Sequence, residues 1–297
     1  MLFQNSSTIP DDAVIVSLSV SPWTYPYWTS RQFLMYELAR YVRIIYATER
    51  TYIRAYGRLS YWKKFFSQKP DAPFDPPTDL ELFEPKITPP LLYGYPGLNK
   101  YSAKIFGKLL GKRCRRSGKK RIIAYVWDPQ LQDCLTGLAP DKIIYHPYDK
   151  FDQFESNEED KQTILESERW IVNIADAVIT PSTMVADYIK HSNSHVIHNG
   201  VFMPAFSNLY EHSEKAVLDM IPSPKIGYIG LLNQKINFDL LLQVAQIRPA
   251  WSFVLVGPIK QQVWQKEKYA SFKKFKSLPN VHSFPPVTFS SVPSIMR

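Results

Sequence analysis

The sequence predicts an α/β protein with two parallel sheets that face each other. Near the N-terminus, the strand-like segments "AVIVSLSV" and "RIIYATE" flank "SRQFLMYELARYV", whose apolar residues have helical spacing. A strand–helix–strand unit of this kind favours a parallel sheet. The same alternation resumes beyond residue 205 with "KIGYIG" and "INFDLLLQVAQIRP". A chain of 297 residues with 45% hydrophobic content can bury about two such cores.

The weak periodicity and the proline of "FMPAFSNLYEHSEK" place the domain boundary near residue 205, which gives domains 1–204 and 205–297. Within the first domain, residues from about 51 to 100 are rich in proline and aromatic side chains. Prolines at this density exclude a long helix, so we expect a loop-rich insertion with short strands.

The first domain continues with a basic helix and then alternates again. We expect strands at "RIIAYVWDP", "KIIYHPYDKF", "DAVITPS" and "HVIHNGV", with an acidic helix at "NEEDKQTILESERWIVNIA" and a short helix at "TMVADYIKH". In the second domain a strand at "SFVLVGP", a basic helix and "VHSFPPV" follow the leucine-rich helix. Ser30 is a plausible cap of the first helix because serine often accepts a backbone hydrogen bond there.

The composition of the chain limits the cellular compartments in which we expect the protein. No apolar run of 18 uncharged residues is present, so we expect no spanning helix, and the N-terminus lacks the features of a signal peptide. Cys114 and Cys134 have no metal-ligand spacing, which makes a disulfide framework or a zinc site unexpected. A cytoplasmic location, with possible peripheral contact to the inner face of the plasma membrane, fits these observations.

The net charge of +9 is concentrated in one segment. Between Lys104 and Arg121 the sequence "KIFGKLLGKRCRRSGKKR" holds nine cations, as many as the whole excess. A solvated helix face is one interpretation, and an anionic membrane surface is the other. Nucleic acid is not expected as a partner, because aromatic residues are not interleaved with the cations. The candidate membrane-contact residues are Lys108, Lys112, Arg113, Arg115 and Arg116.

Polar residues that follow strands are the first candidates for a site, because ligands of open α/β sheets bind beyond the carboxyl ends of the strands. Ser30 and Arg31 open the first helix, as a cap and a surface arginine or as contacts for an anion or acceptor. Asp128 ends one strand. His146 and Asp149 follow another, where a histidine beside a carboxylate has a structural role or a role in proton transfer.

The stretch "KIGYIGLLNQK" suggests a seat for a phosphate-bearing ligand. Gly230 lets the backbone approach a ligand, and Lys235 adds a positive charge before the next helix. The spacing is Gly-x-x-Gly, so a dinucleotide fingerprint is absent. Asn199 and Gly200 form an Asn-Gly pair after a strand, which is also a common turn.

Several segments together resemble glycosyltransferases of the GT-B fold, most closely the family 4 type that includes teichuronic-acid and other cell-surface polysaccharide enzymes. The segments are "ADAVITPSTMVADYI", "HVIHNGVF", "PKIGYIGLLNQKINFDLLLQVAQIRPAWSFVLVGP" and "LPNVHSF", in the family's order. "SPWTYPYWTSRQFLMYELAR" and "YHPYDKF" also fit. The resemblance implies two Rossmann-like domains with a nucleotide-diphospho-sugar donor in the cleft between them.

The resemblance also implies roles for the candidate residues. Gly230 and Lys235 match positions near the donor diphosphate, and Asn199 and Gly200 match the end of the first domain near the cleft. His146 and Asp149 match a strand tip that faces the donor sugar or the acceptor, with Ser30, Arg31 and Asp128 on the acceptor side. The family type retains anomeric configuration, needs no metal or further cofactor, and here would use a lipid-linked or polysaccharide acceptor.

One feature departs from the family pattern. The family carries a Glu-x7-Glu motif late in the second domain, whereas this sequence ends at "VPSIMR". Glu158 and Glu166 have that spacing in the first domain, where an acidic helix produces it by chance. We therefore expect an incomplete second domain in a chain truncated at its C-terminus. The alternative to a transferase is an inactive relative that binds a membrane or a partner.

Overall fold

The computed structural model describes residues 10–19, 21–25, 28–47, 74–83, 89–90, 95–154, 157–203, 206, 218–259 and 266–296. Much of the predicted proline-rich insertion lies outside these residues, as do residues 204 and 205 at the predicted domain boundary. The chain divides into two compact units, Met1–Val201 and Phe202–Arg297.

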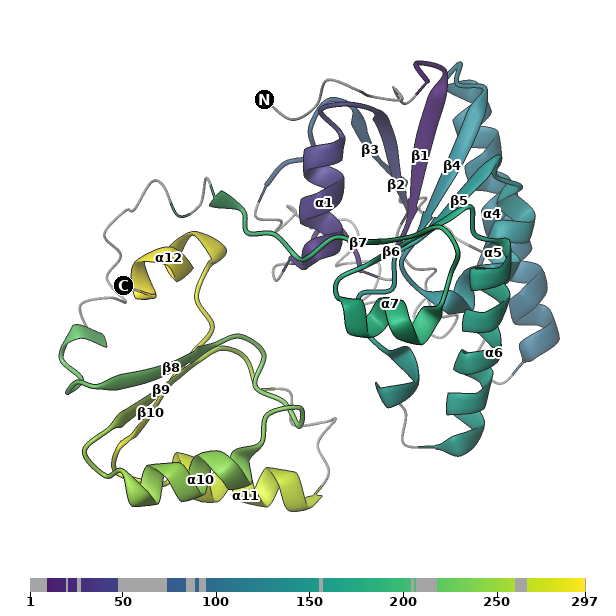
Figure 1. Cartoon of the computed structure of the whole chain (residues 1–297). Helices are drawn as coiled ribbons and strands as arrows, with labels where there is room; N and C mark the ends of the chain where they lie inside the picture. Colours follow the sequence, from purple (N-terminus) through teal and green to yellow (C-terminus); the bar gives the residue numbers. More distant parts are fainter. Residues whose placement is uncertain are drawn as a thin grey trace. The chain divides into compact units, whose positions relative to one another are not determined.

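Unit 1 is built on a parallel sheet with seven described strands, as the strand–helix alternation predicts. The strands are β1 (Ala13–Leu18), β2 (Arg43–Ala47), β3 (Leu80–Phe83), β4 (Arg121–Val126), β5 (Lys142–Tyr145), β6 (Ala177–Thr180) and β7 (Ser194–Val196). Their order is β3-β2-β1-β4-β5-β6-β7 (Figure 1). The chain builds outward from β1 in one direction and then returns to the other side of β1 with β4. Ligands of open α/β sheets bind at such a reversal.

Helices cover both faces of this sheet. They are α1 (Ser30–Leu38), α4 (Pro96–Arg116), α5 (Gln132–Leu138), α6 (Glu158–Ile174) and α7 (Thr183–Ile189), with 3-10 turns at η1 (Pro129–Leu131) and η2 (Phe151–Phe154). Figure 1 shows α1 on one side of the sheet and α4, α5 and α6 on the other. Side chains alternate accordingly along β1: Val14 and Val16 join the core under α4–α6, whereas Ile15 joins the core under α1.

Unit 2 has a parallel sheet of three described strands. These are β8 (Lys225–Ile229), β9 (Ser252–Val256) and β10 (Val281–Phe284), in the order β10-β9-β8. The helices are α10 (Phe238–Ile247), α11 (Lys266–Lys276) and α12 (Val292–Ile295), preceded by the 3-10 turn η4 (Phe289–Ser291). Figure 1 shows α10 and α11 on the same side of this sheet. Phe238 of α10 and Phe272 and Phe275 of α11 pack there against Phe253 and Leu255 of β9.

One helix start differs from the sequence prediction. Thr29, not Ser30, is the N-cap of α1, and its backbone N–H donates to Gln32 Oε1 at 3.1 Å. Ser30 is the first helical residue instead. The basic helix α4 begins at Pro96, because proline is well tolerated in the first turn, where no backbone donor is needed.

Candidate functional site

An aromatic and polar cluster occupies the carboxyl edge of the unit 1 sheet, where β1, β4 and β5 end. The indole Nε1 of Trp127 donates to Ser17 Oγ of β1 at 3.1 Å. Its ring stacks on the imidazole of His146, with centroids 4.7 Å apart and an interplanar angle of 26°. Trp127 is fully buried and His146 is 6% exposed. The cluster is therefore a buried, hydrogen-bonded group of side chains at the edge of the sheet.

His146 pairs with a tyrosine and not with the expected carboxylate. Its Nδ1 lies 2.7 Å from the hydroxyl oxygen of Tyr125. Asp149 is exposed, and its Oδ1 accepts a hydrogen bond from the backbone N–H of Lys150 at 2.9 Å. The expectation that His146 and Asp149 act as a pair is thus not met by the contacts of the described residues. Burial lowers the pKa of His146 to about 4, so the imidazole is neutral at physiological pH.

Arg31 is a buried cation at the same edge of the unit 1 sheet. Its guanidinium lies over the ring of Tyr148, 4.6 Å from the centroid, and its Nε donates to Thr29 Oγ1 at 3.3 Å. The side chain is 8% exposed, and its Nη1 atom is buried without a hydrogen-bond partner among the described residues. A buried N–H without an acceptor costs free energy, so an arriving oxygen atom would satisfy it.

Asp128 lies close enough to Arg31 to interact with it electrostatically. Its Oδ1 accepts from the backbone N–H of Gln130 at 2.8 Å and so caps η1. Burial raises the pKa of Asp128, and this effect outweighs the opposing influence of the Gln130 hydrogen bond and the Arg31 charge. A carboxylate with a raised pKa is a better proton acceptor.

Three of the five residues expected at the strand tips, Arg31, Asp128 and His146, adjoin this aromatic cluster. Arg31 lies over Tyr148, which is within electrostatic range of Asp128 and Asp149, and His146 stacks on Trp127. Ser30 is half-buried and Asp149 is exposed. The sequence analysis did not single out Tyr125, Tyr148 or Ser17. The signal for Tyr148 was present in "YHPYDKF", where an aromatic residue stands two positions after the histidine.

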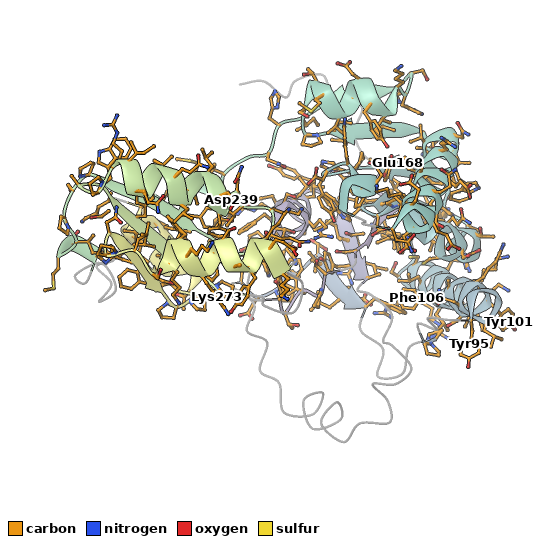
Figure 2. All side chains as sticks on the ribbon, turned by 90° about the horizontal axis from the view of Figure 1, so that it is seen from below. Tyr95, Tyr101, Phe106, Glu168, Asp239 and Lys273 are labelled. Carbon is orange, nitrogen blue, oxygen red and sulfur yellow. The ribbon has the colours of Figure 1, made fainter. Side chains whose placement is uncertain are left out.

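A separate hollow lies on the α6–α7 side of unit 1. It has a volume of about 480 Å³ and is lined by α6 and the end of α7, including Glu168 (Figure 2). Glu168 is 5% exposed and accepts a hydrogen bond from the hydroxyl of Tyr145 at 2.9 Å. Burial raises the pKa of its carboxyl. None of the predicted site residues lines this hollow.

In unit 2, two glycines meet at the carboxyl ends of β8 and β9. Gly230 has φ 152° and Gly257 has φ 150°, a region that favours glycine. The N–H of Gly230 donates to the carbonyl of Val256 at 2.9 Å, and a Cβ on Gly257 would collide with the carbonyl oxygen of Gly230. At these two positions, therefore, no side chain covers the backbone at the edge of the sheet. Gly257 was missed by the sequence analysis, although "VLVGP" shows a strand followed by glycine.

Lys235 follows on the loop between β8 and α10. It is exposed, and its backbone N–H donates to Asn233 Oδ1 at 2.9 Å in a turn. Asn237 caps α10 by accepting from the backbone N–H of Leu240 at 3.0 Å. The loop thus presents a lysine between a glycine-bearing strand tip and a helix start.

Asn199 and Gly200 are exposed in the segment that follows β7 in unit 1. The neighbouring His198 places its Nδ1 2.9 Å from the carbonyl oxygen of Pro181. A Cβ on Gly200 would meet no atom within 4 Å, so sterics alone do not require glycine there.

The predicted membrane-contact residues divide into two groups. Lys108, Lys112, Arg115 and Arg116 are exposed on α4. Arg113 is exposed as well, but it forms an ion pair with Glu81 of β3, which also accepts from Arg43 at 2.9 Å. Arg113 is thus engaged within the fold, unlike the interpretation that grouped it with the other four.

Within the part of the chain that the structure describes, no three His, Cys, Asp or Glu side chains gather as a metal site would require. The described helices also include none with the length and apolar character needed to cross a bilayer.

Comparison with known proteins shows which proteins have a similar sequence or fold. No protein-family model matches the chain. Over 183 residues it is 25% identical to the "Putative teichuronic acid biosynthesis glycosyltransferase TuaH" of Bacillus subtilis (strain 168), an alignment covering 58% of this chain and 42% of that protein. The match thus spans less than half the length of this curated relative.

Solved structures of low sequence identity share the architecture. HepE (Alr3699) of Anabaena in complex with UDP and glucose has a TM-score of 0.61 and 15% identity, with 95% of this chain and 71% of that chain covered. The catalytic domain of starch synthase IV from Arabidopsis thaliana, bound to ADP and acarbose, has a TM-score of 0.54 and 14% identity, with 95% and 76% covered. A UDP-GlcNAc 2-epimerase from Methanocaldococcus jannaschii has a TM-score of 0.50 and 11% identity, with 96% and 76% covered. The chain has the GT-B fold, as its sequence predicts.

Proposed function

We propose that this protein is a glycosyltransferase that moves a sugar from a UDP-sugar to an acceptor hydroxyl. The observation that carries the proposal is the sequence relationship to a protein described as a glycosyltransferase of teichuronic acid biosynthesis. The fold likeness to HepE in complex with UDP and glucose supports the choice of donor.

The donor diphosphate is proposed to bind at the bare backbone edge of unit 2. Gly230 and Gly257 carry no side chain that would keep a phosphate away from the backbone, and Lys235 supplies a positive charge on the same loop. Stabilising the departing UDP in this way lowers the barrier, because negative charge develops on the leaving group. Asn199 and Gly200 are proposed to contribute to the same binding event.

The acceptor is proposed to bind at the strand tips of unit 1. Neutral His146 can position a sugar hydroxyl by hydrogen bonding, and Asp128 can accept its proton. The free Nη1 of Arg31 can bind an oxygen atom of the acceptor. Ser30 and Asp149, at the margin, are proposed as further acceptor contacts. We propose a lipid-linked or polysaccharide acceptor and retention of anomeric configuration.

Nucleotide binding tests the donor half of this proposal. The melting temperature of the full chain is measured with UDP, UDP-glucose, GDP and ADP. We expect stabilisation by the uridine nucleotides, and a weaker effect in Lys235→Ala, whose ammonium group is gone. Lys225→Ala is the matched control, because Lys225 is an exposed lysine at the opposite end of β8. An equal loss in both variants would count against a diphosphate site at Lys235.

The product tests the reaction type. A transferase releases UDP, whereas an epimerase of the kind that shares this fold converts one UDP-sugar into another. Chromatography of the nucleotides after incubation with UDP-glucose or UDP-N-acetylglucosamine, together with a lipid-linked or polysaccharide acceptor, separates these outcomes. The proton coupling at the anomeric carbon of the product then reports retention or inversion. A new UDP-sugar without free UDP would replace the transferase assignment.

A further inference from the structure

A row of apolar side chains runs along the exposed side of α4. Leu98, Tyr101, Ile105 and Leu109 are spaced three or four residues apart, which places them on one face of the helix. Leu98 is 60% exposed, Tyr101 66% and Leu109 37%, and Tyr95, just before the helix, is 64% exposed. Figure 2 shows Tyr95 and Tyr101 at the outer end of α4. Single exposed apolar residues are common, but a row on one helix face indicates an interaction surface.

Cations border this apolar row. Five cations of α4 lie beside the apolar row or continue it toward the C-terminal end of the helix: Lys104, Lys108, Lys112, Arg115 and Arg116. All of them are exposed except Lys104, which is half-buried. The sequence of α4 contains no acidic residue. The helix therefore combines an apolar strip with a strongly positive surface.

The packing of α4 keeps this face outward. The adjacent face of the helix supplies Phe106, Leu110 and Cys114 to the core of unit 1. A Cβ on Gly107 would collide with the carbonyl oxygen of Cys134 in α5, so the two helices cross at close range. A rotation that buried the apolar row would expose the core side and break this crossing.

We propose that this face of α4 binds the surface of a bilayer that contains anionic lipids. Tyr95, Leu98 and Tyr101 would enter the interfacial region, where tyrosine is favoured, and the cations would lie at the level of the lipid phosphates. A nucleic acid would neutralise the cations but leave the exposed Leu98 and Leu109 in water. The combination of an aliphatic row with a cationic border therefore favours a lipid surface. This inference stands whether or not the protein transfers sugar.

Binding of the full chain to lipid vesicles tests whether the cations of α4 contribute to membrane binding. Co-sedimentation is measured with vesicles of phosphatidylglycerol and phosphatidylcholine and with phosphatidylcholine alone, at low and high salt. Each cation near the surface contributes roughly fivefold in partitioning, so replacing four should weaken binding to the anionic vesicles by roughly several hundredfold. The variant carries glutamine at Lys108, Lys112, Arg115 and Arg116, and leaves Arg113 with Glu81.

The matched control removes four cations from the other basic helix. It carries glutamine at Lys266, Lys268, Lys274 and Lys276 of α11, which are exposed. We expect it to keep at least a tenth of the wild-type affinity for anionic vesicles. If both quadruple variants lose affinity equally, net charge and not α4 drives binding, and the proposal fails. It also fails if the α4 variant binds like wild type while circular dichroism shows both to be folded.

A second variant tests whether the apolar row of α4 contributes to membrane binding. Leu98→Ser with Tyr101→Ser should weaken vesicle binding by roughly tenfold or more, because apolar burial is lost while every cation is kept. Met184→Ser with Ile247→Ser is the control, since Met184 is 69% exposed and Ile247 70% exposed on other helices. If the α4 pair has no effect on vesicles, or if duplex DNA binds wild type more tightly than anionic vesicles do, the lipid surface is the wrong occupant.

Discussion

Gly257 and Gly230 lie against each other at the ends of two adjacent strands, so that a side chain on Gly257 would overlap the carbonyl oxygen of Gly230. Gly257 also has a φ of 150°, which alanine adopts only with strain. We expect Gly257→Ala to lower the free energy of unfolding by at least about 2 kcal/mol, from steric overlap and backbone strain together. Urea unfolding of the purified variant measures this.

Gly227→Ala is the matched control for this prediction. Gly227 lies within β8, and a Cβ added there would meet no atom within 4 Å. The control should be neutral or stabilising by up to about 1 kcal/mol, because alanine restricts the unfolded chain. Similar unfolding midpoints for both variants would show that the two strand tips can separate without cost.

His146 should make stability depend on pH in a defined window. Its pKa is lowered by burial to about 4, whereas an unfolded histidine has the ordinary value near 6.5. Above pH 6.5 both states are neutral and its contribution is fully present. As the pH falls toward 4, only the unfolded state binds a proton, so stability declines by at most about 3 kcal/mol from this residue.

The measurement compares urea unfolding at pH 7 and pH 4.5 for wild type and His146→Gln. The variant should lose less stability than wild type over this interval, because glutamine does not titrate. His195→Gln is the control, since His195 is exposed on β7, and it should keep the wild-type dependence. An unchanged dependence in His146→Gln would mean that His146 is charged in the folded protein.

The location of the unit 1 site could be predicted from the sequence, because the carboxyl ends of parallel strands share one edge of the sheet. Asp128 and His146 each follow a buried strand, and the structure places them at that edge. The partner of His146 could not be predicted in the same way. The choice of Tyr125 over Asp149 depends on the register that aligns Tyr125 with Ile144. That register follows from packing and has no local signal in either strand.

An ion pair between residues far apart in the sequence explains why Arg113 differs from its predicted role. Arg113 reads as one of several cations on a basic helix, yet Glu81 of β3 lies beside it and also binds Arg43. Three sequence-distant residues meet there because β3 pairs with β2 at the edge of the sheet. Charge patterning within α4 cannot distinguish a cation that is paired in this way from its free neighbours. The sequence thus predicts the charge of the helix but not which cations remain available.

The close crossing of α4 and α5 predicts a strong effect of a small substitution. Gly107→Ala would place a Cβ against the carbonyl oxygen of Cys134, and we expect a loss of about 1–3 kcal/mol in the free energy of unfolding. Gly97→Ala, in the first turn of the same helix, would meet no atom within 4 Å and should be neutral or stabilising. Equal urea midpoints for the two variants would contradict the crossing.

Arg31 should affect acceptor use without affecting donor binding. Its guanidinium lies over Tyr148, and its buried Nη1 has no hydrogen-bond partner in the part of the chain that the structure describes. A hydrogen bond from a charged donor is worth about 1.5–3 kcal/mol. We therefore expect Arg31→Gln to raise the apparent KM for the acceptor by roughly tenfold or more, while the KM for the UDP-sugar stays the same. Arg31→Lys should recover little, because an ammonium group lacks the planar fork that stacks on Tyr148.

The control for Arg31 is Arg40→Gln, which removes one positive charge just after the same helix. Arg40 is exposed and contacts only Glu37 among its described ion pairs, at 3.3 Å. Steady-state kinetics with each substrate varied separately gives both KM values, and melting temperatures report folding. If Arg31→Gln melts at a lower temperature but keeps both KM values, the guanidinium stabilises unit 1 and takes no part in acceptor binding. If both variants raise the acceptor KM equally, the effect comes from general charge and not from the free N–H of Arg31.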